Sequence, residues 1–92
     1  MFYFIVTQNL DVSHNALTSV SALNGCINLV SFHADENKLE TLELNFNELS
    51  RMVDLSASFN ELIEVSDDIG NLKALESMNL SNNKMVAVPC KY

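Results

Sequence analysis

The chain has 92 residues, of which 48% are hydrophobic, with two Gly, one Pro and a formal net charge of −7. This length corresponds to one domain or to a piece of one, and the hydrophobic content argues against a disordered chain. Twelve acidic residues stand against five basic ones, so few phosphates could be neutralised. We therefore expect neither nucleic acid nor an anionic membrane surface as a partner.

The first segment, residues 1–6, reads "MFYFIV" and is predicted to form a strand or to cover a sheet edge. It has no basic region before its apolar run, and no small-residue cleavage site follows it. It is also much shorter than the roughly 18 residues of a membrane span. A degraded signal peptide is the alternative interpretation.

Four segments of similar pattern follow at a regular spacing. They are "TQNLDVSHNAL" (7–17), "LVSFHADENKL" (29–39), "MVDLSASFNEL" (52–62) and "LESMNLSNNKM" (75–85). Their asparagines, Asn15, Asn37, Asn60 and Asn83, are 22, 23 and 23 residues apart. The pattern is similar to L-x-x-L-x-L-x-x-N-x-L, which is typical of a leucine-rich repeat. We predict repeats over 7–28, 29–51, 52–74 and 75–92, the last one truncated.

The stretch "LETLELNFNEL" (39–49) matches the same template at every fixed position, yet it lies out of phase. Placing Asn47 on the series would give steps of 10 and 13 residues, too short for a coil that turns back on itself. We therefore assign 39–49 to the return limb of the second repeat, where Leu44 is surplus to the pattern. In the next return limb, apolar residues at 3–4 spacing predict a short helix or 3₁₀ turn that starts at Ser66.

These patterns predict an α/β solenoid, a right-handed leucine-rich repeat coil with a parallel sheet of about four strands. In each strand the fixed apolar residues point inward and the residues between them point outward. The asparagine amides have both donors and an acceptor, and we expect them to satisfy backbone groups of the interior turns.

The stretch "NELIEVSDDIGNLKALESMNLSNNKMVAVP" (60–89) resembles intracellular leucine-rich repeat proteins of the Ras-suppressor type. Ser66 stands where that pattern has a proline, whereas Pro89 matches it. The resemblance implies a curved solenoid that binds another protein through its concave sheet face, in a cytoplasmic signalling scaffold. Unlike members of that family, the chain shows no polar capping unit after its fourth repeat. Such units keep repeat proteins soluble, so we expect self-association through the C-terminal edge or a neighbouring polypeptide there.

The outward positions of the strands are the candidate partner-binding site. The residues chosen are Asp11, His33, Asp35, Glu36, Asp54, Ser56, Phe59 and Asn79. Phe59 is the one large apolar residue among them, and either anchors a partner or covers its own neighbours. His33 is expected near Asp11 and Asp35 as a solvated histidine. We expect no catalytic, metal or cofactor site, because an open sheet face lacks converging ligands and a water-excluded cleft.

The sequence therefore predicts a non-catalytic protein–protein interaction module of an intracellular scaffold or adaptor. Stacking of coils places Cys26 and Cys90 roughly 14 Å apart, beyond the ~7 Å limit for a disulfide. Two free thiols favour a reducing compartment. The alternative is a fragment of an extracellular leucine-rich repeat receptor ectodomain. A glycan on the Asn79-Leu80-Ser81 sequon would favour it.

Overall fold

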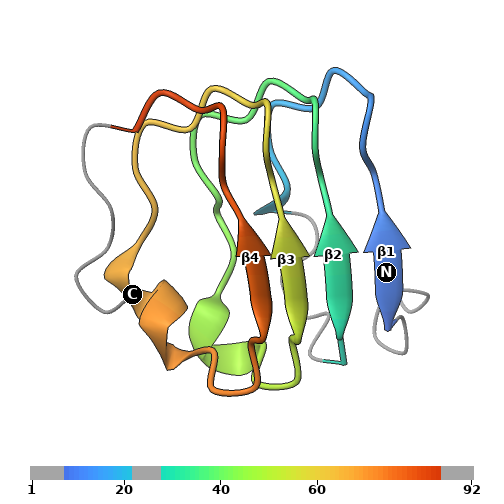
Figure 1. The fold of residues 1–92 in the computed structure, drawn as a ribbon, viewed down its shortest axis with the longest axis vertical. Helices are drawn as coiled ribbons and strands as arrows, with labels where there is room; N and C mark the ends of the chain where they lie inside the picture. Colours follow the sequence, from blue (N-terminus) through green and yellow to red (C-terminus); the bar gives the residue numbers. More distant parts are fainter. Residues whose placement is uncertain (1–7, 22–27, 86–92) are drawn as a thin grey trace.

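The computed structural model describes residues 8–21 and 28–85. Four short strands form one parallel sheet in the order β1-β2-β3-β4, as Figure 1 shows. They are β1 (Asn9–Asp11), β2 (Ser31–His33), β3 (Asp54–Ser56) and β4 (Ser77–Asn79). The predictions made for the segment 1–6, for both cysteines and for Pro89 lie outside the described residues.

The strands repeat in the frame that the four asparagines indicate. Leu10 lies opposite Phe32, Phe32 opposite Leu55, and Leu55 opposite Met78. Phe32 and Leu55 are fully buried, because the single inward side chain of each strand points into the coil. The out-of-phase stretch contributes no strand. The predicted leucine-rich repeat solenoid with a parallel sheet is confirmed.

Each of the two central return limbs contains a single 3₁₀ turn. These are η2 (Phe46–Glu48) and η3 (Asp67–Asn71), and they pack against each other. The hydroxyl of Ser66 accepts a hydrogen bond from the Asp68 N–H at 3.2 Å, so the predicted start of η3 is confirmed. Among the described residues, no helix is long and apolar enough to cross a membrane.

Leu44 is a core residue, although the repeat pattern makes it surplus. Its exposed fraction is 7%, and Leu42 and Phe46 on either side of it are also buried. Glu43 and Asn45 between them are exposed. Buried and exposed side chains therefore alternate in this part of the return limb, as they would in a strand, on the back of the coil. This alternation is why residues 39–49 match the repeat template out of phase.

The core lies in the middle of the stack and thins out at both ends. Sixteen apolar side chains from Val20 to Leu72 form one buried cluster. The side chains packed against it but only partly buried come from the two ends of the array: Leu10, Val12, Leu17, Leu75, Met78, Leu80 and Met85. Within the described residues, the second and third repeats thus have a neighbouring coil on each side, whereas the first and fourth have one on a single side.

The repeated asparagines hold adjacent coils together, as predicted. The Asn60 amide donates to the carbonyls of Ala57 and Ser58 in its own turn, at 3.1 Å each, and to Ala34 of the preceding coil at 2.9 Å. Its oxygen accepts the N–H of Leu39, also in the preceding coil, at 3.1 Å. Asn37 and Asn83 make the equivalent contacts one coil to either side.

We predict that Asn60→Ala lowers the free energy of unfolding by about 1–3 kcal/mol, because buried backbone groups lose their partner. Asn47→Ala is the matched control. Asn47 is exposed, and its side chain makes hydrogen bonds to the exposed side chains of Asp68 and Asn71. Its removal is expected to cost much less in chemical denaturation. Equal losses in the two variants would contradict this account of the asparagines.

Candidate partner-binding surface on the sheet

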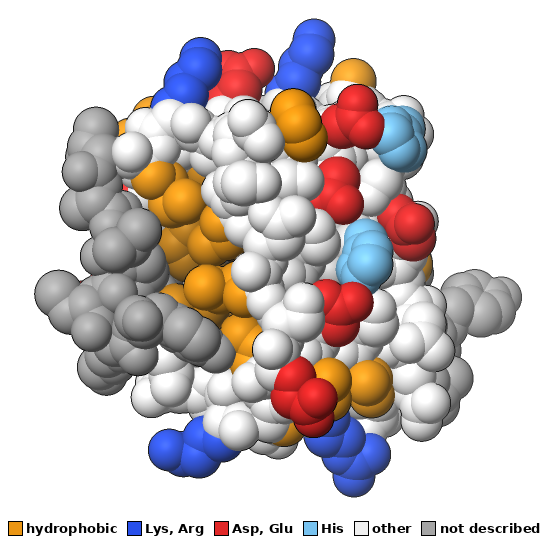
Figure 2. All heavy atoms as spheres, in the orientation of Figure 1, with side chains coloured by type: hydrophobic (Ala, Val, Ile, Leu, Met, Phe, Trp, Pro, Cys, Tyr) orange, Lys and Arg blue, Asp and Glu red, His pale blue; other side chains and the backbone are white. Residues whose placement is uncertain are grey.

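The outward side chains of the four strands, with those of the turn after each strand, form what we call the sheet surface. Figure 2 shows acidic side chains and both histidines gathered there, over the N-terminal side of the sheet. The described Lys and Arg residues all lie outside the strands: Lys38, Arg51, Lys73 and Lys84. The sheet surface is therefore acidic, as the sequence predicts.

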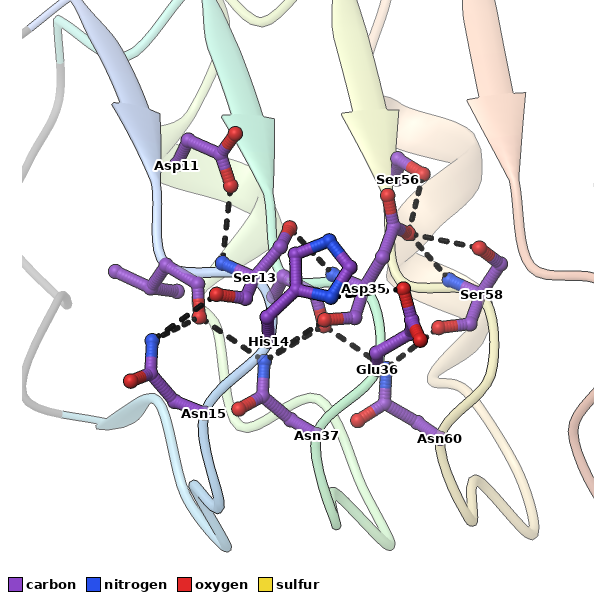
Figure 3. A network of polar contacts seen from close by, with 12 residues as sticks. Asp11, Ser13, His14, Asn15, Asp35, Glu36, Asn37, Ser56, Ser58 and Asn60 are labelled. Carbon is purple, nitrogen blue, oxygen red and sulfur yellow. Dashed lines mark hydrogen bonds and ion pairs between the residues drawn. The ribbon is translucent and has the colours of Figure 1, made fainter.

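Asp35 is the centre of a hydrogen-bond network on this surface (Figure 3). Its Oδ1 accepts from the Ser56 hydroxyl at 2.6 Å, the Ser58 N–H at 2.7 Å and the Ser58 hydroxyl at 2.9 Å. Burial by itself raises the pKa of Asp35, but these three hydrogen bonds outweigh it and the pKa is lowered. Asp35 is therefore a fixed, ionised carboxylate that joins the second repeat to the third.

Serines extend the network towards β1. The Ser13 hydroxyl accepts from the Asp35 N–H at 3.0 Å, and the Ser13 N–H donates to Asp11 Oδ1 at 2.9 Å. This backbone hydrogen bond is the main reason why the pKa of Asp11 is lowered. At the equivalent position of the fourth repeat, Asn79 Oδ1 accepts from the Ser81 N–H and hydroxyl. The serine two residues after the strand thus orders the polar side chain at the end of that strand.

Both histidines pair with an acidic side chain of the next repeat. His33 Nε2 lies 2.7 Å from Asp54 Oδ2, and His14 Nδ1 lies 2.8 Å from Glu36 Oε2. The hydrogen bond to Asp54 is the main reason why the pKa of His33 is raised, against an opposing effect of burial. Asp11 and Asp35, the neighbours that the sequence suggests for His33, only add to this through their negative charge.

Phe59 lies in the turn after β3 with its side chain 57% exposed. Its φ of 55° falls in the left-handed region, which a bulky residue rarely adopts. His14, Glu36 and Asn82 have the same conformation one residue before the asparagine of their own repeat. The turn imposes this backbone, and the N–H of Phe59 donates to Ser81 O at 3.1 Å. The ring is thus held outward instead of covering its neighbours.

The structure brings most of the candidate residues together but gives them different roles. Asp11 on β1 lies opposite His33 on β2, and His33 contacts Asp54 on β3. The other candidates are Asp35, Glu36 and Phe59, which follow the strands, and Asn79 on β4. Ser56 is only 7% exposed, so it supports Asp35 and is not the accessible group that the pattern predicts. The sequence places Ser13, His14 and Ser58 at outward positions, but they were not chosen as candidates, although the serine that recurs two residues after the strand was a usable signal.

Two other observations concern binding chemistry. Within residues 8–21 and 28–85, no group of three or more His, Asp or Glu side chains is arranged to hold a metal ion.

A hollow of about 390 Å³ lies between the return limbs, away from every candidate residue. It is lined by Thr41, Leu42, Glu64, Val65, Ser66 and Asp67.

The raised pKa of His33 predicts a pH-dependent stability. The unfolded chain has the ordinary histidine pKa of 6.5, so the pair with Asp54 stabilises the fold fully below that pH. This contribution is lost as the pH rises through the folded-state pKa. We expect Asp54→Asn to lower the pKa of His33 in an NMR titration. The stability lost in Asp54→Asn should also be larger below pH 6.5 than well above it.

Glu48→Gln is the control for this titration, because it removes the same charge from the exposed end of η2. It should leave the titration of His33 nearly unchanged. A His33 pKa that is the same in Asp54→Asn and in the wild-type chain would contradict the assignment.

Comparison with known proteins places the chain among longer repeat proteins. No protein-family model matches it. Lumican of Gallus gallus is 31% identical over 89 residues, which cover 92% of this chain and 25% of lumican. Fibromodulin of Sus scrofa is 29% identical over 87 residues, which cover 92% of this chain and 58% of that sequence. The chain therefore spans about a quarter of lumican.

A solved structure agrees with these sequence matches. A leucine-rich repeat protein of Leptospira interrogans superposes with a TM-score of 0.82 at 29% identity. The match covers 89% of this chain and 21% of that protein. Together with the repeated strands and the asparagines between the coils, these matches show that the chain is a leucine-rich repeat protein.

Proposed function

We propose that the chain is a non-catalytic protein–protein interaction module that binds its partner across the sheet surface. The observation that carries this proposal is the arrangement of acidic side chains on an open face. Serine hydroxyls and backbone N–H groups hold Asp11 and Asp35 in place, and histidines hold Glu36 and Asp54. Side chains that are already ordered lose less conformational entropy when a partner binds.

The partner that fits this surface carries basic residues. Glu36 and Asp11 are exposed and Asp54 is half-buried, so their carboxylates can be reached from solvent. Opposite charge on the partner accelerates association more than it tightens binding. Protonation of His33 cancels part of the negative charge, so a basic partner should associate more slowly as the pH falls through the raised pKa of that histidine.

Phe59 supplies the apolar anchor of the proposed interface. Aromatic residues are enriched in interfaces, where they bury a large area with few rotatable bonds. Because the turn fixes its backbone and turns its ring outward, Phe59 can be buried by a partner without any rearrangement of the coil. It lies next to the acidic side chains, one coil beyond Glu36.

The proposal also concerns the cellular setting of the protein. We keep an intracellular scaffold or adaptor in a signalling context as the first candidate, because the two cysteines predict a reducing compartment. The resemblance to Ras-suppressor-type proteins stays a prediction.

The proposal is tested with a partner captured by a pull-down and then purified. A triple variant, Asp11→Asn, Glu36→Gln and Asp54→Asn, keeps the shapes of the side chains and removes three charges. We expect its association rate to fall several-fold at low salt and its salt dependence to flatten, as in other steered complexes. Asp35 is left unchanged, because it is a structural acceptor for two buried serines.

The matched control removes three exposed charges from the return limbs: Glu40→Gln, Glu48→Gln and Glu64→Gln. In the same experiment Phe59→Asn, which suits the left-handed backbone, should mainly accelerate dissociation. Association rates that fall equally in the triple variant and in its control would show that net charge acts and the sheet surface does not.

The extracellular ectodomain fragment is the second candidate, because Asn79 is exposed on β4 within its sequon. If the protein is secreted, we expect a glycan on Asn79 after expression in a secretory eukaryotic host, seen by mass spectrometry as a mass that a glycosidase removes. Asn79→Gln is the control. Secreted protein without a glycan at Asn79 would contradict this expectation.

A further inference from the structure

Neighbouring coils are joined by one set of backbone contacts that recurs at every junction. Between the third and fourth repeats, the N–H groups of Ala57 and Phe59 donate to the carbonyls of Asn79 and Ser81, at 2.9 and 3.1 Å. The N–H of Leu62 donates to Asn83 Oδ1 at 3.0 Å. The two earlier junctions contain the same three bonds. Between the first and second repeats the donors are the N–H groups of Val12, His14 and Leu17, and between the second and third they are those of Ala34, Glu36 and Leu39.

The C-terminal end of the array offers the same three donors once more. At the equivalent positions of the fourth repeat, these donors are the N–H groups of Leu80, Asn82 and Met85. Within residues 8–21 and 28–85, none of these N–H groups has a hydrogen-bond acceptor. Among the described residues, this end therefore presents the donor side of a further junction.

The N-terminal end offers the matching acceptors. The carbonyls of Asp11 and Ser13 and the side-chain oxygen of Asn15 are the equivalents of the groups that accept at the junctions. In the described part of the chain, no backbone N–H of another coil donates to them. The Asn15 amide donates to Val12 and Ser13 of its own turn, so its oxygen is oriented like those of the later asparagines.

Apolar side chains match at the same two ends. Leu10 and Leu17 are only partly buried at one end, and Met78 and Met85 are partly buried at the other. Their equivalents inside the array, Phe32, Leu39, Leu55 and Leu62, are fully buried because a coil packs on each side of them. Figure 2 shows hydrophobic side chains open to view beside β4.

We propose that two copies of this chain join head to tail, with β4 of one copy pairing in parallel with β1 of the next. Continuing the observed register places Ser77 opposite Asn9, Met78 opposite Leu10 and Asn79 opposite Asp11 of the second copy. The three donors then meet the three acceptors, and the two apolar rows cover each other. The sheet surface stays open in this arrangement, so the inference is independent of the proposed function.

The geometry also dictates how the assembly behaves. A head-to-tail contact uses two different surfaces, so it does not close on itself after two copies and can continue into longer chains. The net charge of −7 on each copy opposes association. Added salt screens this repulsion and is expected to strengthen the contact.

The experiment uses the full chain and two matched variants at equivalent repeat positions. Met85→Lys places a charge at the C-terminal end, and Leu17→Lys places one at the N-terminal end. Charged side chains are a common way in which natural proteins block a sheet edge. In sedimentation velocity, the wild-type chain should grow in mass with concentration, and each variant alone should stay monomeric.

An equimolar mixture of the two variants is the decisive measurement. Each variant keeps the edge that the other has lost, so the mixture should form a one-to-one dimer and nothing larger. If two C-terminal ends met instead, Leu17→Lys alone would dimerise and the mixture would add no new species. That result, or a wild-type chain that remains monomeric at high micromolar concentration and high salt, would overturn the proposal.

Folding of each variant is verified by circular dichroism and chemical denaturation. Met78→Lys and Leu10→Lys form a second matched pair at the strand positions, for use if a lysine at position 17 or 85 unfolds its chain. Restored dimerisation in a mixture of two folded variants supports the head-to-tail contact, and its absence overturns it.

Discussion

The side-chain amide of the repeated asparagine is the interaction on which the rest of this structure depends. Each turn after a strand leaves backbone groups in the interior, where they need partners. Asn60 satisfies carbonyls of its own turn and, at the same time, a carbonyl and an N–H of the preceding coil. One side chain therefore fixes both the shape of a turn and the position of its coil on the preceding one, which explains why the coils stack at a constant register.

The same turn produces the chemistry of the sheet surface. The residue before each of these asparagines is held in the left-handed region, which is why Phe59 is turned outward and exposed. Two residues after each strand, a serine or aspartate contributes an N–H or a hydroxyl to the side chains of the surface. Asp35 accepts such hydrogen bonds from Ser58, and another from Ser56, both in the following repeat. The acidic surface is thus ordered by contacts between repeats and, at Asp11, by a contact within its own repeat.

Translational repetition also explains the two ends. Within the described residues, the N–H groups that donate to the next coil at every junction have no acceptor in the fourth coil, and the equivalent acceptors of the first coil receive no N–H from another coil. The half-buried Leu10 and Met78 show the same deficit in apolar packing. A repeat protein therefore has two kinds of interaction surface with different chemistry. The sheet surface is set by side chains that vary from repeat to repeat, and the ends are set by the repeated backbone.

The sequence by itself determined the strand frame, the inward residues, the role of the asparagines and the capped turn at Ser66, because these features recur at a fixed period or depend on neighbouring residues. It also indicated which side chains point outward. The tertiary structure decided that His33 pairs with Asp54, that Asp35 accepts hydrogen bonds from the buried Ser56 and Ser58, and that Leu44 joins the core. These contacts run diagonally between strands or across the coil, so they depend on the register and twist of adjacent repeats. A periodic pattern in the sequence specifies neither that register nor that twist.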